Sequence, residues 1–500
     1  MLVSLQLQNE QHSEDYDAPS IIDIVDNTHT NKTSELYHRS TLPPPLQYYK
    51  TFCMSNKSAK LGVLPFFVEL GYKRVRYWED AHIIWSPSVP SRTANTNKDD
   101  PSTIFTKLER WQRLGHIPTQ KMLNDKGLYI KWMKLISQHT GQSIEYIPRT
   151  YILHDDDEIK EVLLMLQQEL FVTTNNTNRI SPNPWILKHG TSSSGKGVTM
   201  MGPRSIELRE FYKQLSVYYD NSNKSNSTSL VDSISSSSNS SMEKVSKFEK
   251  DMKNSRYTLQ AYICNLLLYQ GRKFDLRVYW LVVSIDPLNV LFHYGQIRAN
   301  PTIYNTTHFE SDSLKHMTHA GHGSEVLNWK VLEDLVTHHY ETNKEELSLH
   351  VGTSTSPFDH VVNQMKHILG HIVESYKDIA FQSIITKQQL SSDNGYQLFG
   401  ADFSIDEDLD VFFIEVQTGP LLVANYTKSH YFATLCKNVI QSTLNLIEEV
   451  QHTQSQGLPV LSLANLGTFD PIPIYSNGKP YKYNNYKGHK QNKRPCQFRS

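Results

Sequence analysis

The chain has 500 residues, a formal net charge of −1 and a hydrophobic content of 38%. This length exceeds what one simple core organises, so two or three lobes are expected. The balanced charge excludes a strong overall field, which argues against a nucleic-acid partner, and no apolar run is long enough to span a membrane. The N-terminus lacks the pattern of a secretory signal, and four widely separated cysteines favour a reducing compartment, so a cytoplasmic location is expected.

Composition and periodicity divide the chain into four parts. Residues 1–50 are polar and proline-containing, which predicts a disordered N-terminal arm. Residues 51–175 mix short strand and helix patterns, which predicts an N-terminal α/β lobe. Residues 176–450 contain several strands rich in aromatic and β-branched residues, a mostly helical stretch at 329–390 and a final helix, with a serine-rich insertion at 221–241. Residues 451–500 are predicted to form a basic, mostly disordered tail.

The first candidate site is the segment "PWILKHGTSSSGKGVTMM", residues 184–201. Gly190 to Lys196 matches seven of the eight positions of a phosphate-binding loop, but Gly197 replaces the hydroxyl residue that ligates magnesium in such loops. The pattern predicts a hairpin in which Lys188 ends one strand and a Gly/Ser loop presents backbone N–H groups to phosphate. An ordinary exposed turn is the alternative, because glycine and serine are common in turns.

The second candidate is the strand start "GRKFDLRVYWLV". Alternation places Lys273, Asp275 and Arg277 on one face of the strand and apolar residues on the other. A solvated charged face is the alternative interpretation. The strand continues into "VYWLVV", which is typical of a buried strand, and buried strands seldom carry three charges unless an ionic group is bound.

The third candidate is "FGADFSIDEDLDVFFIEVQTGP", which reads as two strands joined by an acidic turn. Asp402 lies on the first strand, and Glu415 and Gln417 share one face of the second. Pairing of these strands would gather two carboxylates and an amide oxygen, the kind of ligands that magnesium prefers. The alternative is a structural acid pair on an edge hairpin.

The order of these segments resembles an ATP-grasp enzyme, and more specifically the tubulin tyrosine ligase-like family. The resemblance covers about residues 60–450 and rests on "WILKHGTSSSGKGV", "LQAYICNLLLYQGRKFDLRVYWLV", "YGQIRAN", "KHMTHA" and the "FGADF…FIEV" pair. It implies an α/β (α+β) fold in which two ATP-grasp lobes close on ATP and a small N-terminal α/β domain precedes them.

The resemblance also implies a role for each matching residue. Catalytic roles fall on Arg277 at the transferred phosphate, Arg298 at the acyl-phosphate or incoming amino acid, and Lys126 at the acidic acceptor peptide. ATP would be held by Lys188, Ser194, Gly195, Lys196, Gly197, Gln260, Tyr262, Ile263, Lys273 and Asp275, and magnesium by Asp402, Glu415 and Gln417. The chain departs from the family at Gln417 and His319, where the family has asparagine, and at His189, where proline is common.

The implied activity is an ATP- and magnesium-dependent ligation that adds amino acids, with glutamate expected, to carboxylates of tubulin C-terminal tails through an acyl-phosphate. The implied partners are tubulin or microtubules and a free amino acid, in the cytoplasm and cytoskeleton, including a cilium, flagellum or basal body. Two alternatives stay open at this point: a catalytically weak ATP-grasp scaffold that binds microtubules, and a ligase for a small metabolite. The amino acid, initiation or elongation, and the choice of α- or β-tubulin are also open.

Overall fold

The computed structural model describes about three fifths of the chain, and all of the described residues belong to one compact unit. The described residues are 50–55, 62–85, 104–105, 107–109, 111–117, 121–171, 184–190, 197–224, 248, 252, 257–285, 288–305, 316–318, 323–352, 355–386, 394–423, 429–456 and 463–473. The predicted N-terminal arm, nearly all of the serine-rich insertion and the end of the predicted basic tail lie outside these residues.

The largest sheet is antiparallel and has the strand order β12-β11-β10-β13-β14, with β9 paired to β10 and β15 paired to β11. Its strands are β9 (Leu268–Tyr269), β10 (Arg272–Ile285), β11 (Leu288–Ala299), β12 (Glu325–Leu327), β13 (Gln397–Ile405), β14 (Val411–Gln417) and β15 (Asp470–Pro471). The long central strands are rich in β-branched and aromatic residues, which suit a sheet whose two faces are both covered.

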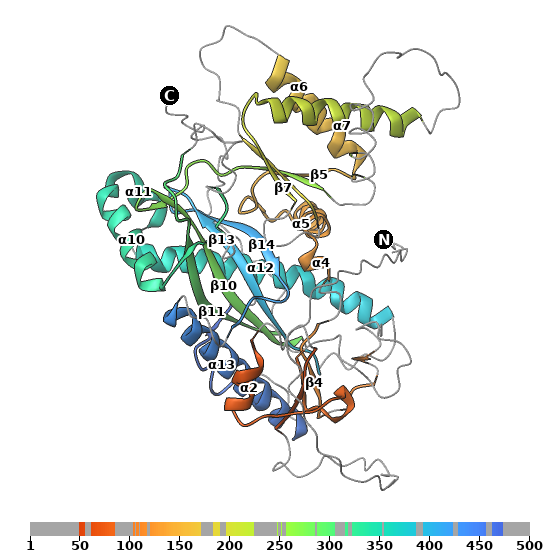
Figure 1. The fold of residues 1–500 in the computed structure, drawn as a ribbon, viewed down its shortest axis with the longest axis vertical. Coiled ribbons are helices and arrows are strands. Elements are labelled where there is room, and N and C mark those ends of the chain that lie inside the picture. The colour runs from red at the N-terminus through yellow and green to blue at the C-terminus, as the bar shows by residue number, and fades with distance from the viewer. Residues whose placement is uncertain are drawn as a thin grey trace. The chain divides into compact units, whose positions relative to one another are not determined.

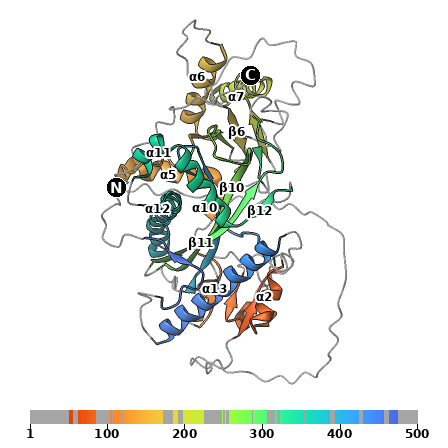
Figure 2. The same ribbon diagram turned by 90° about the vertical axis from the view of Figure 1, so that its left-hand side faces the viewer.

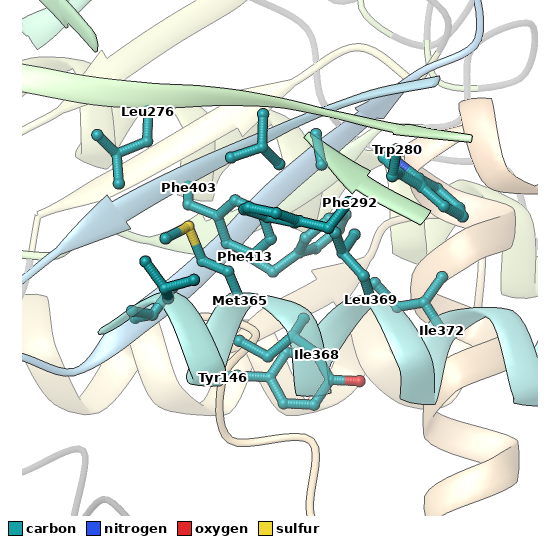
Figure 3. Packing of buried hydrophobic residues seen from close by; sticks show 14 of the residues in the cluster. Tyr146, Leu276, Trp280, Phe292, Met365, Ile368, Leu369, Ile372, Phe403 and Phe413 are labelled. Atoms are coloured by element: carbon teal, nitrogen blue, oxygen red, sulfur yellow. The ribbon is translucent and has the colours of Figure 1, made fainter. Parts of the chain in front are cut away.

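One face of the large sheet packs on a helical layer. Its helices are α5 (Lys126–Thr140), α10 (Trp329–Thr342), α11 (Lys344–Val351) and α12 (Pro357–Thr386). Figure 3 shows Met365 and Leu369 of α12 pointing towards the sheet that carries Phe403 and Phe413, with Ile368 beside Tyr146 in the same core. The three helix residues lie three and four positions apart, so they form one apolar stripe of the helix.

The other face of the large sheet carries charges near the start of β10 and apolar residues further along the strand. There Tyr279, Leu281 and Val283 form a second core with helix α13 (His430–Ser455). The same core includes Phe67 of helix α2 (Leu64–Glu69) and Ile83 of the N-terminal sheet. Figures 1 and 2 show α13 and α2 side by side, as their contacts indicate.

The N-terminal sheet is parallel and has the order β2-β1-β3-β4. Its strands are short: β1 (Thr51–Cys53), β2 (Lys73–Arg74), β3 (Ile83–Ile84) and β4 (Arg113–Leu114), with the 3-10 helix η2 (Trp78–Asp80) between β2 and β3. The fully buried Arg113 donates to the carbonyl oxygen of Val283 at 2.9 Å and to the side chain of Gln454 at 2.7 Å. These bonds connect the small sheet to β10 and α13.

The third sheet is antiparallel and has the order β5-β8-β6-β7. Its strands are β5 (Thr150–Ile152), β6 (Trp185–Lys188), β7 (Val198–Met201) and β8 (Thr258–Ala261). Its helices are the short α4 (Lys121–Asn124), which precedes α5, and α6 (Asp156–Phe171) and α7 (Ile206–Lys224), which share a core with one face of this sheet (Figure 1).

In two places the structure groups segments differently from the four-part division of the chain that was based on the sequence. Strand β5 and helix α6 were assigned to the lobe at 51–175, but β5 pairs with β8 and α6 packs against α7. Likewise, residues 463–473 were assigned to the tail, but β15 pairs with β11 and Phe469 is buried. Both differences arise from pairing between distant segments, which local composition does not encode. The mixed α/β class is confirmed.

None of the helices in the described part of the chain combines the length and the hydropathy that a membrane span requires.

We predict that Gly295→Ala strongly destabilises the fold. A Cβ atom at this position would lie 1.8 Å from the carbonyl oxygen of Arg277, across a bulge in the β10–β11 pairing. The two strands would have to separate, at a cost of about 3 kcal/mol or more. Urea denaturation would measure this loss. Gly419→Ala is the matched control, because a Cβ there would meet nothing within 4 Å. Equal stability of the two variants would contradict the prediction.

Candidate active site

A cavity of about 170 Å³ lies between the large sheet and the third sheet. The third sheet contributes mostly apolar side chains to its wall, among them Ile186, Val198 and Met200. The large sheet contributes charged side chains from four neighbouring strands, and the start of α5 and residues 316–318 complete the lining. One side of the cavity is therefore mostly apolar, apart from Lys188 and Gln260, and the other is ionic.

The charged face predicted for β10 is confirmed. Lys273 and Arg277 are buried, and the residues between them on the opposite face belong to the helical core. Asp275 accepts hydrogen bonds from Lys273 at 2.5 Å, from Ser404 of β13 at 2.7 Å and from Thr318. Burial alone would raise the pKa of Asp275, but these donors and the nearby Arg298 hold it below its ordinary value. Asp275 is therefore ionised and joins three separate segments.

Asp402 of β13 is held by two arginines, Arg277 of the adjacent strand β10 and Arg298 of β11, the strand beyond it. The Arg277 guanidinium donates through Nε to Oδ1 and through a terminal nitrogen to Oδ2 at 2.8 Å, and Arg298 approaches Oδ2 at 2.9 Å. Burial opposes ionisation of Asp402, but the two guanidinium groups outweigh it and hold its pKa well below the usual range. Burial would likewise lower the pKa of Arg277, and Asp402 reverses that effect.

Asp402 and Glu415 lie directly opposite each other in the β13–β14 pairing, as the sequence predicts. Side chains at such positions of an antiparallel pair lie close together. Glu415 forms an ion pair with Lys126 at 3.2 Å and accepts a hydrogen bond from the Gln417 amide nitrogen at 2.5 Å. Lys126 therefore reaches the predicted metal site, whereas the resemblance assigned it to the acceptor peptide. Gln417 presents its nitrogen to Glu415, so a metal bond from this residue would need the amide reversed.

Lys188 lies at the end of β6 and lines the cavity, as the hairpin pattern predicts. Its backbone position pairs with Val198, and His189 N–H donates to the carbonyl of Gly197 at 3.0 Å. Burial lowers the pKa of Lys188 to about 8; Glu415 opposes this shift and Lys126 adds to it. The remaining loop residues of the prediction, Ser194, Gly195 and Lys196, lie outside the described residues.

Gln260, Tyr262 and Ile263, which the resemblance assigns to ATP binding, also line the cavity. Tyr262 and Ile263 follow β8, and the Tyr262 hydroxyl is 2.9 Å from Nδ1 of His316. The Gln260 side chain lines the wall as well, beside Lys188. Apolar and aromatic side chains in a cavity wall suit a planar heterocycle.

Several lining residues were not singled out from the sequence. Thr318 and His316 lie in the quoted "KHMTHA", and Ser404 lies two residues after Asp402, so same-face spacing could have identified it. A bulge between Asp402 and Phe403 brings Ile414 into the cavity beside Glu415, and no sequence pattern announces that bulge. His319 lies outside the described residues.

The residues present fit a nucleotide with a divalent cation. The two Asp402 oxygens offer about four lone-pair positions, and three of them are used by the arginines. One position is left, and Glu415 could exchange its ion pair with Lys126 for a metal bond. In the described part of the chain, no group of three or more His, Cys, Asp or Glu side chains is placed to hold a metal. A cation would thus depend on two carboxylates and on groups of the nucleotide, which is how magnesium usually binds beside phosphates.

The Tubulin-tyrosine ligase family model matches residues 105–456, so the chain belongs to this family of ligases. The predicted resemblance is therefore confirmed. The matched range includes all the strands that form the cavity.

Three relatives show how closely other members match. Protein polyglycylase TTLL10 of Macaca fascicularis is 24% identical over 367 residues, 70% of this chain and 50% of the relative. Inactive polyglycylase TTLL10 of Homo sapiens is 24% identical over 347 residues, 66% of this chain and 43% of the relative. Probable tubulin polyglutamylase TTLL9 of Rattus norvegicus is 24% identical over 363 residues, 69% of each chain. The chain spans about half the length of the first two.

We predict that Lys188→Met stabilises the folded protein at pH 7. The pKa of Lys188 in the folded protein, about 8, lies below its ordinary value, so the folded state is penalised for holding the charge at pH 7. Methionine removes this penalty and should raise the free energy of unfolding by on the order of 1 kcal/mol. Because the penalty falls as pH rises above the folded pKa, the gain should shrink by pH 9.5.

Urea denaturation at both pH values would measure this gain. Lys213→Met is the control, because Lys213 is exposed and its partner, Glu210, is exposed too. A gain that is equal at the two pH values, or equal in the control, would show that the charge of Lys188 is not the cause.

Proposed function

We propose that the protein is an ATP-dependent ligase that joins the amino group of an amino acid to a carboxylate of an acidic protein tail, with tubulin as the expected acceptor. The observation that supports this most is the gathering of Lys188, Lys273 and Arg298 beside the Asp402–Glu415 pair around one cavity. Such a site suits a polyphosphate with a metal on one side and a carboxylate substrate on the other. The sheets on its two sides would be the lobes of an ATP-grasp fold.

The proposed reaction has two steps. An acceptor carboxylate attacks the γ-phosphorus of ATP, so that ADP leaves and an acyl-phosphate forms. The amine of the incoming amino acid then attacks the acyl carbon, phosphate leaves, and the amine proton passes to solvent or phosphate. A magnesium ion held by Asp402 and Glu415 would neutralise phosphate charge.

The chain's own residues would act mainly by charge and position. Lys188 and Lys273 would bind phosphate oxygens, and Arg298 would hold the acyl-phosphate or the amino acid. Lys126 would be released from Glu415 when the cation binds there, and its ammonium would then be available to an acidic acceptor. This exchange reconciles the role that the resemblance assigned to Lys126 with its place beside Glu415.

Glutamate is the proposed amino acid, as the resemblance to polyglutamylases implies. Glycine is the competing donor, because the macaque relative is named a polyglycylase. The cationic residues of the cavity already face Asp275, Asp402 and Glu415, so a glutamate side chain would compete with these carboxylates for them. Glycine places no such demand on the site. The location that goes with this proposal is the cytoskeleton, including the cilium.

A weak or inactive scaffold is the second candidate. Gln417 is one methylene longer than the family's asparagine, and in this structure its amide nitrogen, not its oxygen, faces Glu415. The human relative named an inactive polyglycylase shows that the family includes inactive members. A scaffold would still bind nucleotide or microtubules but would add no amino acid.

We predict that the purified protein, given ATP, magnesium and tubulin, adds glutamate to tubulin tails in a way that mass spectrometry of the tails detects. Glu415→Gln should reduce the rate by at least about a hundredfold, because it removes one of two carboxylates from the proposed metal site. A parallel reaction with glycine in place of glutamate tests whether glycine is the amino acid that is added.

Gln417→Asn separates the ligase from the scaffold. If the site is active, this change restores the family's shorter side chain and the rate stays within a few fold or rises. Parent activity equal to that of Glu415→Gln, with either amino acid and saturating ATP and magnesium, would reject the ligase in favour of the scaffold.

A further inference from the structure

Three polar side chains from adjacent strands form a row on the cavity face of the third sheet. Thr150 of β5 and Gln260 of β8 are direct partners in the strand pairing. On β6 the partner of Gln260 is Ile186, and Lys188 lies two residues further along the same face, diagonally across from Gln260. Gln260 and Thr150 are both buried. The resemblance assigned Gln260 to ATP binding, and the sequence suggested no role for Thr150.

The hydrogen bonds in this row all run in one direction. Lys188 Nζ donates to Oε1 of Gln260 at 2.5 Å, and Nε2 of Gln260 donates to Oγ1 of Thr150 at 2.8 Å. The Thr150 hydroxyl donates to the backbone oxygen of Pro148 at 2.6 Å. The threonine has a single hydroxyl proton, which goes to Pro148, so its oxygen must accept from the amide. The amide orientation is thereby determined at both ends, since an ammonium can only donate.

Other charged groups attract or repel the Lys188 ammonium, and the hydrogen bonds of the row must hold it in place against them. Glu415 and Asp275 attract its ammonium group, and Lys126 and Lys273 repel it. A lysine side chain has four rotatable carbon–carbon bonds and does not hold a position by itself. A neutral acceptor at a defined place holds the ammonium at the cavity wall without neutralising it, so that its charge is available to a phosphate.

We propose that Thr150, acting through the side-chain amide of Gln260, is a positioning residue that aims the Lys188 ammonium at the phosphates of a bound nucleotide. This inference rests on the proposed nucleotide site. Without Thr150 the amide nitrogen of Gln260 loses its acceptor, so the amide is held only by the mobile ammonium and can rotate away, which releases Lys188 towards Glu415. The row acts only through Lys188, which makes the idea testable by a double-mutant cycle.

The test measures binding of a non-hydrolysable ATP analogue with magnesium by calorimetry, using the full chain. Thr150→Val should raise the Kd about tenfold, because it removes one hydrogen bond from a row that ends at a charged group. Thr150→Ser keeps the hydroxyl and should stay within about twofold of the parent. Thr443→Val is the matched control: Thr443 is a buried threonine of α13 whose hydroxyl bonds to the Val439 carbonyl, and the Kd should not change.

The decisive comparison uses Lys188→Ala as the background. There Thr150→Val should have no further effect on the Kd, because the residue through which it acts is gone. A tenfold loss that persists in this background, or no loss in the parent background, would overturn the inference. Should Thr150→Val not fold, Thr150→Ala takes its place in the same cycle with the same expected and contrary results.

The outcomes also separate this inference from the proposed function. If Lys188→Ala leaves the Kd unchanged, or no analogue binds to the parent, the nucleotide site itself is rejected and the positioning role with it. If Lys188→Ala weakens binding and Thr150→Val does not, the nucleotide site stands and only the positioning role is rejected.

Discussion

The contact of Asp402 with Arg277 and Arg298 is the interaction on which the site depends. The three residues come from adjacent strands of one sheet, and all three are buried. Burying ions is costly, and the attraction among them compensates only while every partner is present. Gly400 leaves the space that this arrangement needs, because a Cβ there would lie 3.0 Å from the Arg277 side chain. The order of the strands, the ionic cluster and the small residue beside it therefore depend on one another, and the loss of Asp402 would leave two buried arginines without this carboxylate.

Strand β10 of the central sheet both packs in the core and carries charged groups of the site. One face of β10 is apolar throughout and packs on α12, while the other face is ionic near the strand start and apolar beyond Arg277. Extensive apolar packing on both faces supports the strands that carry the charges, and so limits how far the charged groups can move. A preorganised set of charges is what phosphate chemistry requires, since the reaction itself needs little covalent participation by the protein.

Membership of the Tubulin-tyrosine ligase family does not determine which amino acid a member uses. The matched relatives bear names that refer to glycine or to glutamate, at similar levels of identity. A fold of this kind supports several specificities because a few side chains around the site select the substrate. In the proposed function, the balance between cations and carboxylates around Arg298 would select the amino acid that this chain uses. Gln417 adds a second variable, because it lies beside Glu415 at the proposed metal position.

Alternation in the sequence was sufficient to place Lys273, Asp275 and Arg277 on one face of a strand. The strand–turn–strand pattern was sufficient to place Glu415 near Asp402. Motif order alone identified the family, because these residues lie within continuous segments with a regular period. Tertiary structure decided the rest. The bonds of Thr318 and Ser404 to Asp275, the pairing of β5 with β8 and the row from Lys188 to Thr150 join residues that lie as far as 129 positions apart in the sequence. The bulge that brings Ile414 into the cavity likewise depends on how β13 and β14 pair. Local propensity carries no information about such partners, since they are selected by the packing of whole elements against one another.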